Sequence, residues 1–295
     1  MKATARSPTW PNSWGLPSPG AAASLVGSSI TTTTEPSTCS SPHTKRTSLT
    51  SPPTILDQPH HGIFPRLYKN DGNGRFTDVT RQVGLDHPYL PMGANFGDLD
   101  NDGYLDFYLA TGDPGYESLM PNVMLRNDRG RRFQDVTTSG GFGHLQKGHG
   151  VAFADIDNDG DQDIYHQLGG FYPGDAFQNV LFLNPGHGNH YLAIQLEGTT
   201  TNRPGVGARL KVVVQTPQGP AAFHRAAGSV SSFGGSPRRQ EIGLGNATSI
   251  ERVEIQWPTS KTTQVLTEVP MDTMIKITEG VPGFETQSLK RIRLN

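Results

Sequence analysis

A nine-residue acidic pattern, Asp-x-Asp-x-Asp-Gly-x-x-Asp, occurs twice in this chain, at residues 98–106 and 155–163. Four carboxylates held in one short loop repel one another unless a cation neutralises them. Calcium takes six to eight oxygen ligands at about 2.3–2.6 Å, and a loop of this spacing can supply them. A glycine at the sixth position, Gly103 or Gly160, suits the sharp bend between ligands because it has no Cβ. Each copy therefore predicts a calcium loop.

We predict about two calcium sites, each with side-chain ligands at positions 1, 3, 5 and 9 and a backbone carbonyl at position 7. An EF-hand would have a Glu at position 12, where this chain has Leu109 and His166, so a helix–loop–helix is not expected. The alternative is an Asp- and Gly-rich turn without metal. The predicted ligands are Asp98, Asp100, Asp102, Tyr104 and Asp106 in one loop and Asp155, Asp157, Asp159, Asp161 and Asp163 in the other.

The segments that flank both loops have the composition of β-strands. Residues 94–97 and 151–154 lead into the loops, and residues 105–109 and 163–165 lead out of them. These short runs are aromatic and β-branched and are bounded by Gly and Asp, which is typical of strands joined in hairpins. Both loops are therefore expected to connect two strands.

The repeat extends well beyond the acidic loops. Residues 67–80 match residues 124–137, a third partial copy begins at residue 181, and all of these pairs share an offset of 57 residues. A constant period rich in strands and turns indicates a β-propeller blade or a solenoid unit. Residues 70–74 are interpreted as a hairpin turn. Metal binding there is the weaker alternative because the segment has one carboxylate.

Composition limits the classes of protein to which the chain can belong. With 35 Gly, 23 Pro and 18% charged residues, the chain suits an all-β protein with many turns. A net charge of −2 without a Lys/Arg cluster argues against nucleic-acid binding, and no apolar run reaches the ~18 residues of a membrane span. Cys39 is the single cysteine, so no intramolecular disulfide can form and calcium is expected to stabilise the fold instead.

The calcium loops predict an extracellular or periplasmic location, because extracellular modules commonly bind calcium in the roughly 10⁻⁴–10⁻³ M range. No apolar segment follows residues 1–6, so a secretion signal would have to lie upstream. Residues 1–58 are rich in Ser, Thr, Pro and Gly, which predicts disorder. An alternative is that much of residues 1–58 is an out-of-frame reading of an earlier blade, since permitted codons for residues 29–39 spell the acidic loop in a shifted frame. Sequencing the DNA would decide between the two.

The sequence pattern changes near residue 187. Six or seven short strands alternate with Gly/Pro turns through residues 187–281, which suggests a small sandwich-like β domain. Residues 205–209 lack the third glycine and the following helix of a dinucleotide-binding loop, so they are interpreted as a turn. The expected organisation is a leader at 1–58, repeats at 59–186, a β domain at 187–281 and a tail at 282–295.

These motifs resemble known modules. The acidic loops and the segments at 70–80 and 127–137 are similar to FG-GAP/VCBS repeats. Residues 205–209, 225–229, 242–245, 253–258 and 278–280 are similar to the ASPIC/UnbV domain. Together they resemble the cartilage acidic protein-like family over roughly residues 62–281. Two features depart from that pattern: a closed propeller needs four to eight blades, and the usual Pro-Ser-Gly-Lys turn appears as residues 258–261 without its Gly.

The resemblance implies a secreted calcium-binding protein that acts in adhesion or recognition of a protein or glycan ligand, with calcium in a structural role. The expected fold is all-β, with a partial β-propeller followed by a small β-sandwich-like ASPIC/UnbV module. Open blade edges also offer a route to self-association. The alternative function is a glycan- or polysaccharide-processing enzyme built on a calcium-stabilised propeller.

A search for catalytic residues favours the noncatalytic interpretation. No zinc-type His-Glu-x-x-His, Gly-x-Ser-x-Gly or phosphate-binding Gly-x-x-x-x-Gly-Lys-Ser/Thr motif is present. Trp257 and Phe233 are expected to pack in the core, with sugar stacking as the alternative. The histidines are expected in exposed loops or strands, and they are His144, His149, His166, His187, His190 and His224.

Overall fold

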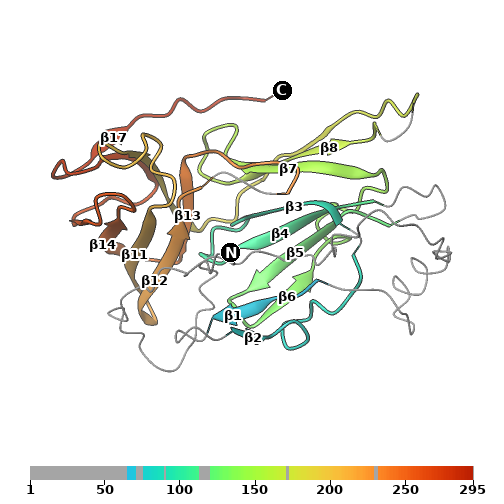
Figure 1. The fold of residues 1–295 in the computed structure, drawn as a ribbon, viewed down its shortest axis with the longest axis horizontal. Coiled ribbons are helices and arrows are strands. Elements are labelled where there is room, and N and C mark those ends of the chain that lie inside the picture. The colour runs from blue at the N-terminus through green and yellow to red at the C-terminus, as the bar shows by residue number, and fades with distance from the viewer. Residues whose placement is uncertain are drawn as a thin grey trace, which may run out of the picture.

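The computed structural model describes residues 65–70, 76–89, 91–112, 120–170, 173–228 and 232–294. Every regular element in these ranges is a β-strand, so the all-β prediction is confirmed. Figure 1 shows the strands in two groups, with the repeats on one side and the C-terminal strands on the other. The predicted leader, including the stretch discussed as a shifted reading frame, lies outside the described residues.

The repeats form part of a β-propeller. Each sheet is antiparallel, and strands that follow one another in sequence pair with one another, in the orders β1-β2, β3-β4-β5-β6 and β7-β8-β9. We call the second of these sheets the first full blade and the third the last blade. The strands are β1 (Tyr68–Asn70), β2 (Phe76–Asp78), β3 (Pro91–Gly97), β4 (Asp106–Thr111), β5 (Val123–Asp128), β6 (Arg132–Asp135), β7 (Gly148–Ala154), β8 (Asp163–Leu168) and β9 (Val180–Phe182).

The 57-residue period is a period of structure as well as of sequence. Asn122 Oδ1 accepts a hydrogen bond from Thr111 N at 2.8 Å, and Asn179 Oδ1 accepts the equivalent bond from Leu168 N at 3.2 Å. The same offset relates β1 and β2 to β5 and β6, so β1 and β2 form the outer half of a blade. Their pairing, with Asn70 opposite Phe76, agrees with the predicted hairpin, whose residues 71–75 lie outside the described ranges.

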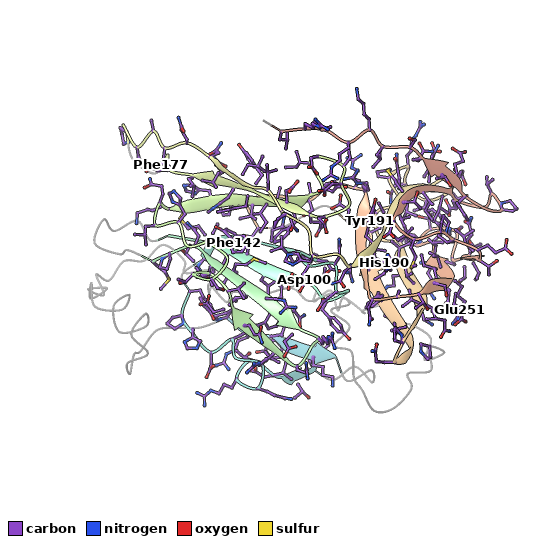
Figure 2. The ribbon with its side chains drawn as sticks, turned by 180° about the vertical axis from the view of Figure 1, so that it is seen from behind. Asp100, Phe142, Phe177, His190, Tyr191 and Glu251 are labelled. Carbon is purple, nitrogen blue, oxygen red and sulfur yellow. The ribbon has the colours of Figure 1, made fainter. Side chains whose placement is uncertain are left out.

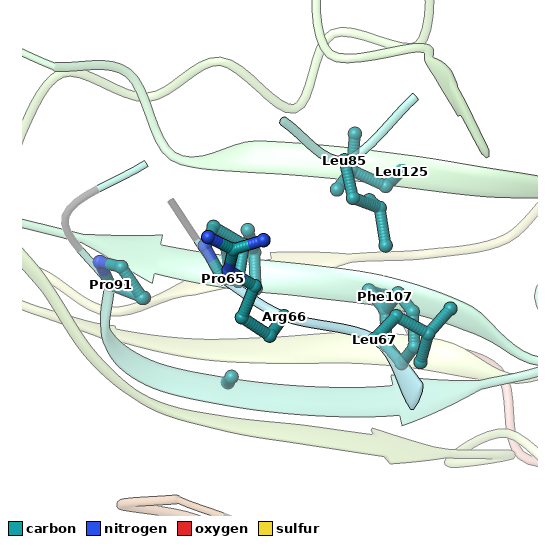
Figure 3. Close-up of a pocket in the computed structure, with 9 residues that line it drawn as sticks. Pro65, Arg66, Leu67, Leu85, Pro91, Phe107 and Leu125 are labelled. Carbon is teal, nitrogen blue, oxygen red and sulfur yellow. The ribbon is translucent and has the colours of Figure 1, made fainter. Parts of the chain in front are cut away.

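Two small apolar cores hold the repeats together. One lies where β1 meets the first full blade and includes Leu67, Phe107 and Leu125. The other lies between that blade and the last blade and includes Tyr108 and Phe153, both fully buried. A cavity of about 30 Å³ remains beside the first core (Figure 3), and its lining is almost entirely apolar. A space of this size holds about one water and no organic ligand.

The C-terminal strands form two four-stranded sheets, in the orders β13-β10-β16-β17 and β12-β11-β14-β15. The predicted strands of residues 187–281 are all present, and β10 pairs with β16 in parallel. One further strand lies in the predicted tail and extends the first sheet. The strands are β10 (His190–Glu197), β11 (Arg209–Thr216), β12 (Gly219–Ala226), β13 (Gln240–Gly245), β14 (Ser249–Gln256), β15 (Thr263–Leu266), β16 (Thr273–Thr278) and β17 (Glu285–Gln287).

The two C-terminal sheets pack as a sandwich around one large core. Leu192, Ile194, Val212, Ile255 and Trp257 are at most 1% exposed and belong to this core. The first four come from strands of both sheets, and Trp257 directly follows β14, as expected for two packed sheets. The predicted burial of Trp257 is confirmed.

The turns of this domain rely on positive φ angles. Gly205 and Gly207 have φ of 69° and 92°. These angles agree with the prediction that residues 205–209 form a turn and not a dinucleotide-binding loop. In the turn of residues 258–261, Lys261 adopts a φ of 60°. Ser260 is the residue at the position of the usual Gly, and its φ is not positive, so the turn forms without the conformational freedom that Gly would give there.

Glu279 closes one end of the sandwich. Its carboxylate accepts hydrogen bonds from the backbone N–H groups of residues 199–201 at 2.7–2.9 Å and from the hydroxyls of Thr201 and Ser260 at 2.8 and 2.6 Å. Burial acts to raise the pKa of Glu279, but the hydrogen bonds from Ser260 and from residues 199–201 outweigh it and lower that pKa to about 2.

We expect the Glu279→Gln variant to unfold more easily by about 2 kcal/mol at pH 7, because bonds to a charged acceptor become bonds to a neutral one. The pKa of Glu279 is about 2 in the folded chain against an ordinary 4.5. Its contribution is therefore complete above pH 4.5 and is lost as the pH falls toward 2. Urea unfolding across this range measures both effects. Glu285→Gln, at an exposed position in β17, should change little, and an equal loss in both variants would contradict the assignment.

Candidate metal centre

The two acidic loops connect β3 to β4 and β7 to β8, and they lie against each other. Asn101 Nδ2 donates to Gly160 O at 3.0 Å and to Asp161 Oδ1 at 2.9 Å. Gln162 Oε1 accepts from Asp98 N at 2.7 Å. Because each loop joins the first two strands of its blade, neighbouring blades place the same loop at the same end of the propeller. The two loops therefore lie side by side at that end of the propeller.

Both loops have the same backbone conformation. The asparagine at position 4 has a positive φ in each, 53° at Asn101 and 58° at Asn158. The glycine at position 6 follows with 93° at Gly103 and 98° at Gly160. Asparagine is among the few residues other than Gly that adopt the left-handed region readily. The two asparagines therefore have a conformational role that the search for ligands did not identify.

The structure brings together the side chains at positions 1, 3 and 5 of each loop. One carboxylate oxygen from each of the three residues lies within 4.8 Å of the other two. Oxygens this close can share one cation whose ligand distances are about 2.3–2.6 Å. The two clusters are Asp98, Asp100 and Asp102, and Asp155, Asp157 and Asp159.

Position 9 has a different set of contacts. Asp106 accepts from Leu99 N at 2.9 Å with one oxygen and from Asn127 N at 2.7 Å with the other. Asp163 makes the equivalent bonds to the N–H groups of Ile156 and Asn184, at 3.0 and 2.9 Å. These residues close the loop and join it to the third strand of the blade. Ligation by them, and by the carbonyls of Tyr104 and Asp161, stays a prediction.

Burial and mutual repulsion make the charged form of these carboxyl groups unfavourable. Burial, with Asp100 as a smaller contribution, raises the pKa of Asp102 to about 6. Burial also raises the pKa of Asp155 to about 6, against the lowering effect of Arg239. The pKa values of Asp98 and Asp106 rise for the same main reason. A cation among these groups would oppose all of these shifts.

One atom in the second loop lacks a partner. Asp157 Oδ1 is buried and accepts no hydrogen bond from any described residue. Leaving a buried carboxylate oxygen unpaired costs free energy. The atom belongs to the cluster of Asp155, Asp157 and Asp159, so the donor set of the second loop fits a hard cation that takes oxygen ligands.

The C-terminal sandwich contacts the first loop through Arg225 of β12. Arg225 Nη2 lies 2.8 Å from Asp98 Oδ2, and both side chains are buried, at 9% and 1% exposed. The same guanidinium donates to Gly103 O at 3.3 Å. A Cβ on Gly103 would lie 2.0 Å from the ring of Phe223. Glycine at position 6 is therefore required by this contact as well as by its φ.

The second loop has matching contacts. Arg239 Nη2 lies 3.5 Å from Asp155 Oδ2 and donates to Asp155 O at 2.8 Å. A Cβ on Gly160 would lie 2.1 Å from the ring of Tyr191. Arg291, in the predicted tail, pairs with Asp159 at 2.8 Å. Figure 2 shows Asp100 and Tyr191 in the region where the repeats and the sandwich meet.

The ion pairs leave negative charge in the first loop. It holds the carboxylates of positions 1, 3, 5 and 9, and two guanidinium groups pair with them, since Arg126 Nη2 also lies 2.6 Å from Asp100 Oδ2. Four carboxylates and two guanidiniums leave two negative charges, which one divalent cation would balance.

The contacting residues Arg225, Arg239, Phe223 and Tyr191 were not predicted to belong to the site. Arg225 was recognised only as part of the C-terminal motif. They lie between 31 and 127 residues from the carboxylates and glycines that they contact, and only the fold brings them there. The signal that could have been used is Arg225 itself, a charged residue in a strand otherwise composed mainly of small and apolar residues.

Two predictions about aromatic side chains were wrong. His166 is fully buried and its Nδ1 lies 3.2 Å from Tyr108 Oη, because β8 packs against the first full blade. Burial lowers the pKa of His166 to about 4. Phe233 is 71% exposed with a φ of 57°, so its ring lies outside the core. The histidines were expected to be exposed, and Phe233 to be buried.

We expect the Arg225→Met variant to lose about 3–5 kcal/mol of stability, because it leaves the Asp98 carboxylate buried without its partner. Arg203→Met is the matched control, since its pair with Glu197 is at the surface, with Arg203 85% exposed, and surface pairs contribute about 0–1 kcal/mol. Urea unfolding of both variants measures the difference. Adding Asp98→Asn to Arg225→Met should restore part of the loss, and a loss of under 1 kcal/mol in Arg225→Met would contradict the role of the pair.

Comparison with known families adds two matches. Residues 59–109 match the FG-GAP-like repeat, and residues 198–282 match the family described as ASPIC and UnbV. A search of curated proteins found no match. FG-GAP repeats are typical of extracellular proteins. The described residues contain no helix long and apolar enough to cross a membrane. Both matches agree with the predicted modules and their order, and the chain therefore contains an FG-GAP-like repeat followed by a domain that matches ASPIC and UnbV.

Proposed function

We propose that this chain is a secreted calcium-binding repeat protein that acts in adhesion or recognition, with calcium in a structural role. The buried and unpaired Asp157 Oδ1, inside a cluster of three carboxylates, is the observation that carries the calcium part. Residues at positions 1, 3 and 5 of each loop would hold the ion. Bound calcium would supply positive charge where the carboxylates are crowded and would fix the loop.

The position of the loops supports a structural role more than a catalytic one. Each loop is covered by an arginine and an aromatic ring of the C-terminal domain, which leaves little access for a substrate. Calcium at this place would stabilise the blade hairpins and the surface on which the C-terminal domain packs. A structural ion also suits a chain whose single cysteine, Cys39, provides no intramolecular disulfide.

The alternative, a glycan-processing enzyme, would need paired carboxylates about 5–10 Å apart in a cleft. The larger of two described pockets is a groove of about 550 Å³ beside β10 and β16. Its single lining carboxylate, Glu197, already pairs with Lys276 at 2.6 Å and Arg203 at 3.1 Å. Because the groove has no second carboxylate, it supports a noncatalytic role, and we include that role in the proposal.

We expect calcium to raise the melting temperature of the full chain. If a site binds with a Kd of about 10 μM, then 1 mM calcium adds about 2.7 kcal/mol for that site. Asp100→Ala and Asp157→Ala should each remove the contribution of one loop, whereas Asp86→Ala, outside both loops, should keep the full shift. Calorimetric melts with calcium and with chelator provide the measurement. Equal melting temperatures in the two buffers would refute calcium binding.

Recognition can be tested separately from calcium binding. The calcium-loaded chain would be applied to a glycan array and to intact cell surfaces, with Asp100→Ala/Asp157→Ala as the comparison. Saturable binding that the double variant loses would support recognition by the calcium-stabilised form. Turnover of an array glycan would instead favour the enzyme.

A further inference from the structure

The chain beyond β17 returns to the repeats and lies on the second acidic loop. Figure 1 shows this segment leaving β17 and extending over the side of the repeats that carries β7. Ile292 N donates a hydrogen bond to Asp157 O at 2.7 Å, and Asn158 Nδ2 donates to Lys290 O at 3.1 Å. Two backbone groups of the tail are therefore bonded to consecutive residues of the loop. We call residues 290–292 the docked segment.

The residue between these two bonds places its charge on a predicted calcium ligand. Asp159, at position 5 of the loop, has a partner for each oxygen. Its Oδ1 accepts from Asp161 N at 3.0 Å, and its Oδ2 accepts from Arg291 Nη2 at 2.8 Å. The Asp159 side chain is 11% exposed, whereas that of Arg291 is 69% exposed. A cation that binds Asp159 therefore either displaces Arg291 or stays close to its positive charge.

The two loops obtain their arginines from different places. In the first loop, Arg225 of the sandwich pairs with position 1 and Arg126 of the blade pairs with position 3. In the second loop, Arg239 of the sandwich pairs with position 1. Leu183 stands where the blade would supply the equivalent of Arg126. The second arginine comes instead from the tail, as Arg291, and pairs with position 5.

The charges of the second loop make this arginine important for a cation. The loop has one more carboxylate than the first, because position 7 is Asp161. Its five carboxylates and the two guanidiniums of Arg239 and Arg291 leave three negative charges. Four negative charges would remain without Arg291. A divalent cation is therefore attracted more strongly to this loop when the docked segment is away from it.

We propose that the docked segment competes with calcium for the second acidic loop. Arg291 holds the Asp159 carboxylate and lowers the affinity of the loop for calcium, and calcium binding releases residues 290–292. This inference rests on the proposed calcium function and assigns a regulation to one of its two sites. Because coupling between two binding events is reciprocal, calcium weakens docking of the segment by the same factor.

Calcium titration of the full chain tests the competition. Asp100→Ala serves as the parent, so that heat of calcium binding measured by calorimetry reports the second loop. Adding Arg291→Ala should tighten calcium binding about 3–10-fold, the range expected when an exposed arginine pair is removed from beside a divalent ion. Arg293→Ala is the matched control, since it removes an exposed arginine two residues away and should leave the affinity unchanged. Arg291→Lys keeps the charge and should tighten binding less than Arg291→Ala.

Hydrogen exchange of the tail tests the reciprocal effect. The Ile292 N–H is bonded to Asp157 O, so calcium should make the amides of the docked segment exchange several-fold faster. Asp157→Ala, which removes a predicted ligand but keeps the backbone carbonyl, should abolish this response to calcium.

The outcomes separate this inference from the calcium function on which it rests. Calcium uptake by the Asp100→Ala parent with equal affinity in Arg291→Ala and Arg293→Ala would overturn the competition alone. Weaker binding in Arg291→Ala, or tail exchange that calcium leaves unchanged or slows, would do the same. A parent that takes up no calcium would overturn the second calcium site and the competition together.

Discussion

The crowding of carboxylates at the junction between the repeats and the sandwich is the constraint on which the rest of the structure depends. Buried Asp98 and Asp106 have raised pKa values because burial disfavours their charged forms. Two kinds of contact offset part of this cost. Backbone N–H groups donate hydrogen bonds to the carboxylate at position 9, and arginines form ion pairs with the carboxylates at positions 1 and 3. These contacts leave part of the charge unbalanced, and the loop sequence supplies the oxygens that a divalent cation would use.

The two modules are joined through these loops, so the acidic pattern has two roles at once. Position 1 of each loop pairs with an arginine of the sandwich, and position 6 lies under one of its aromatic rings. Asp98 uses Oδ2 for Arg225 and Gly243 N. If calcium fixes the loop, it also fixes the orientation of Asp98 and the space below Phe223. Loop order and domain packing are therefore expected to be linked, since both depend on the same side chains.

The repeat could be predicted from sequence because its signals are local. The spacing of four Asp and one Gly specified the loop, and the offset of 57 residues specified the blade. The contacts of Arg225 and Arg239 could not be predicted. A strand pattern predicts where strands form, but it does not identify the residues of other elements that a given side chain contacts. Phe233 failed for a related reason: an aromatic residue usually packs in a core, but a φ of 57° places it in a bend whose backbone contacts the blades.

His166 illustrates how the repeat both informs and misleads. Its neighbour Tyr165 is the equivalent of a buried tyrosine, yet His166 is the buried residue and Tyr165 the exposed one. Alternation along β8 places the two side chains on opposite faces of the sheet. The face of His166 packs on the preceding blade, whereas the face of Tyr165 would pack on a following one. Burial in a propeller therefore depends on the neighbouring blade as much as on the residue type, and the sequence of one blade defines only half of each interface.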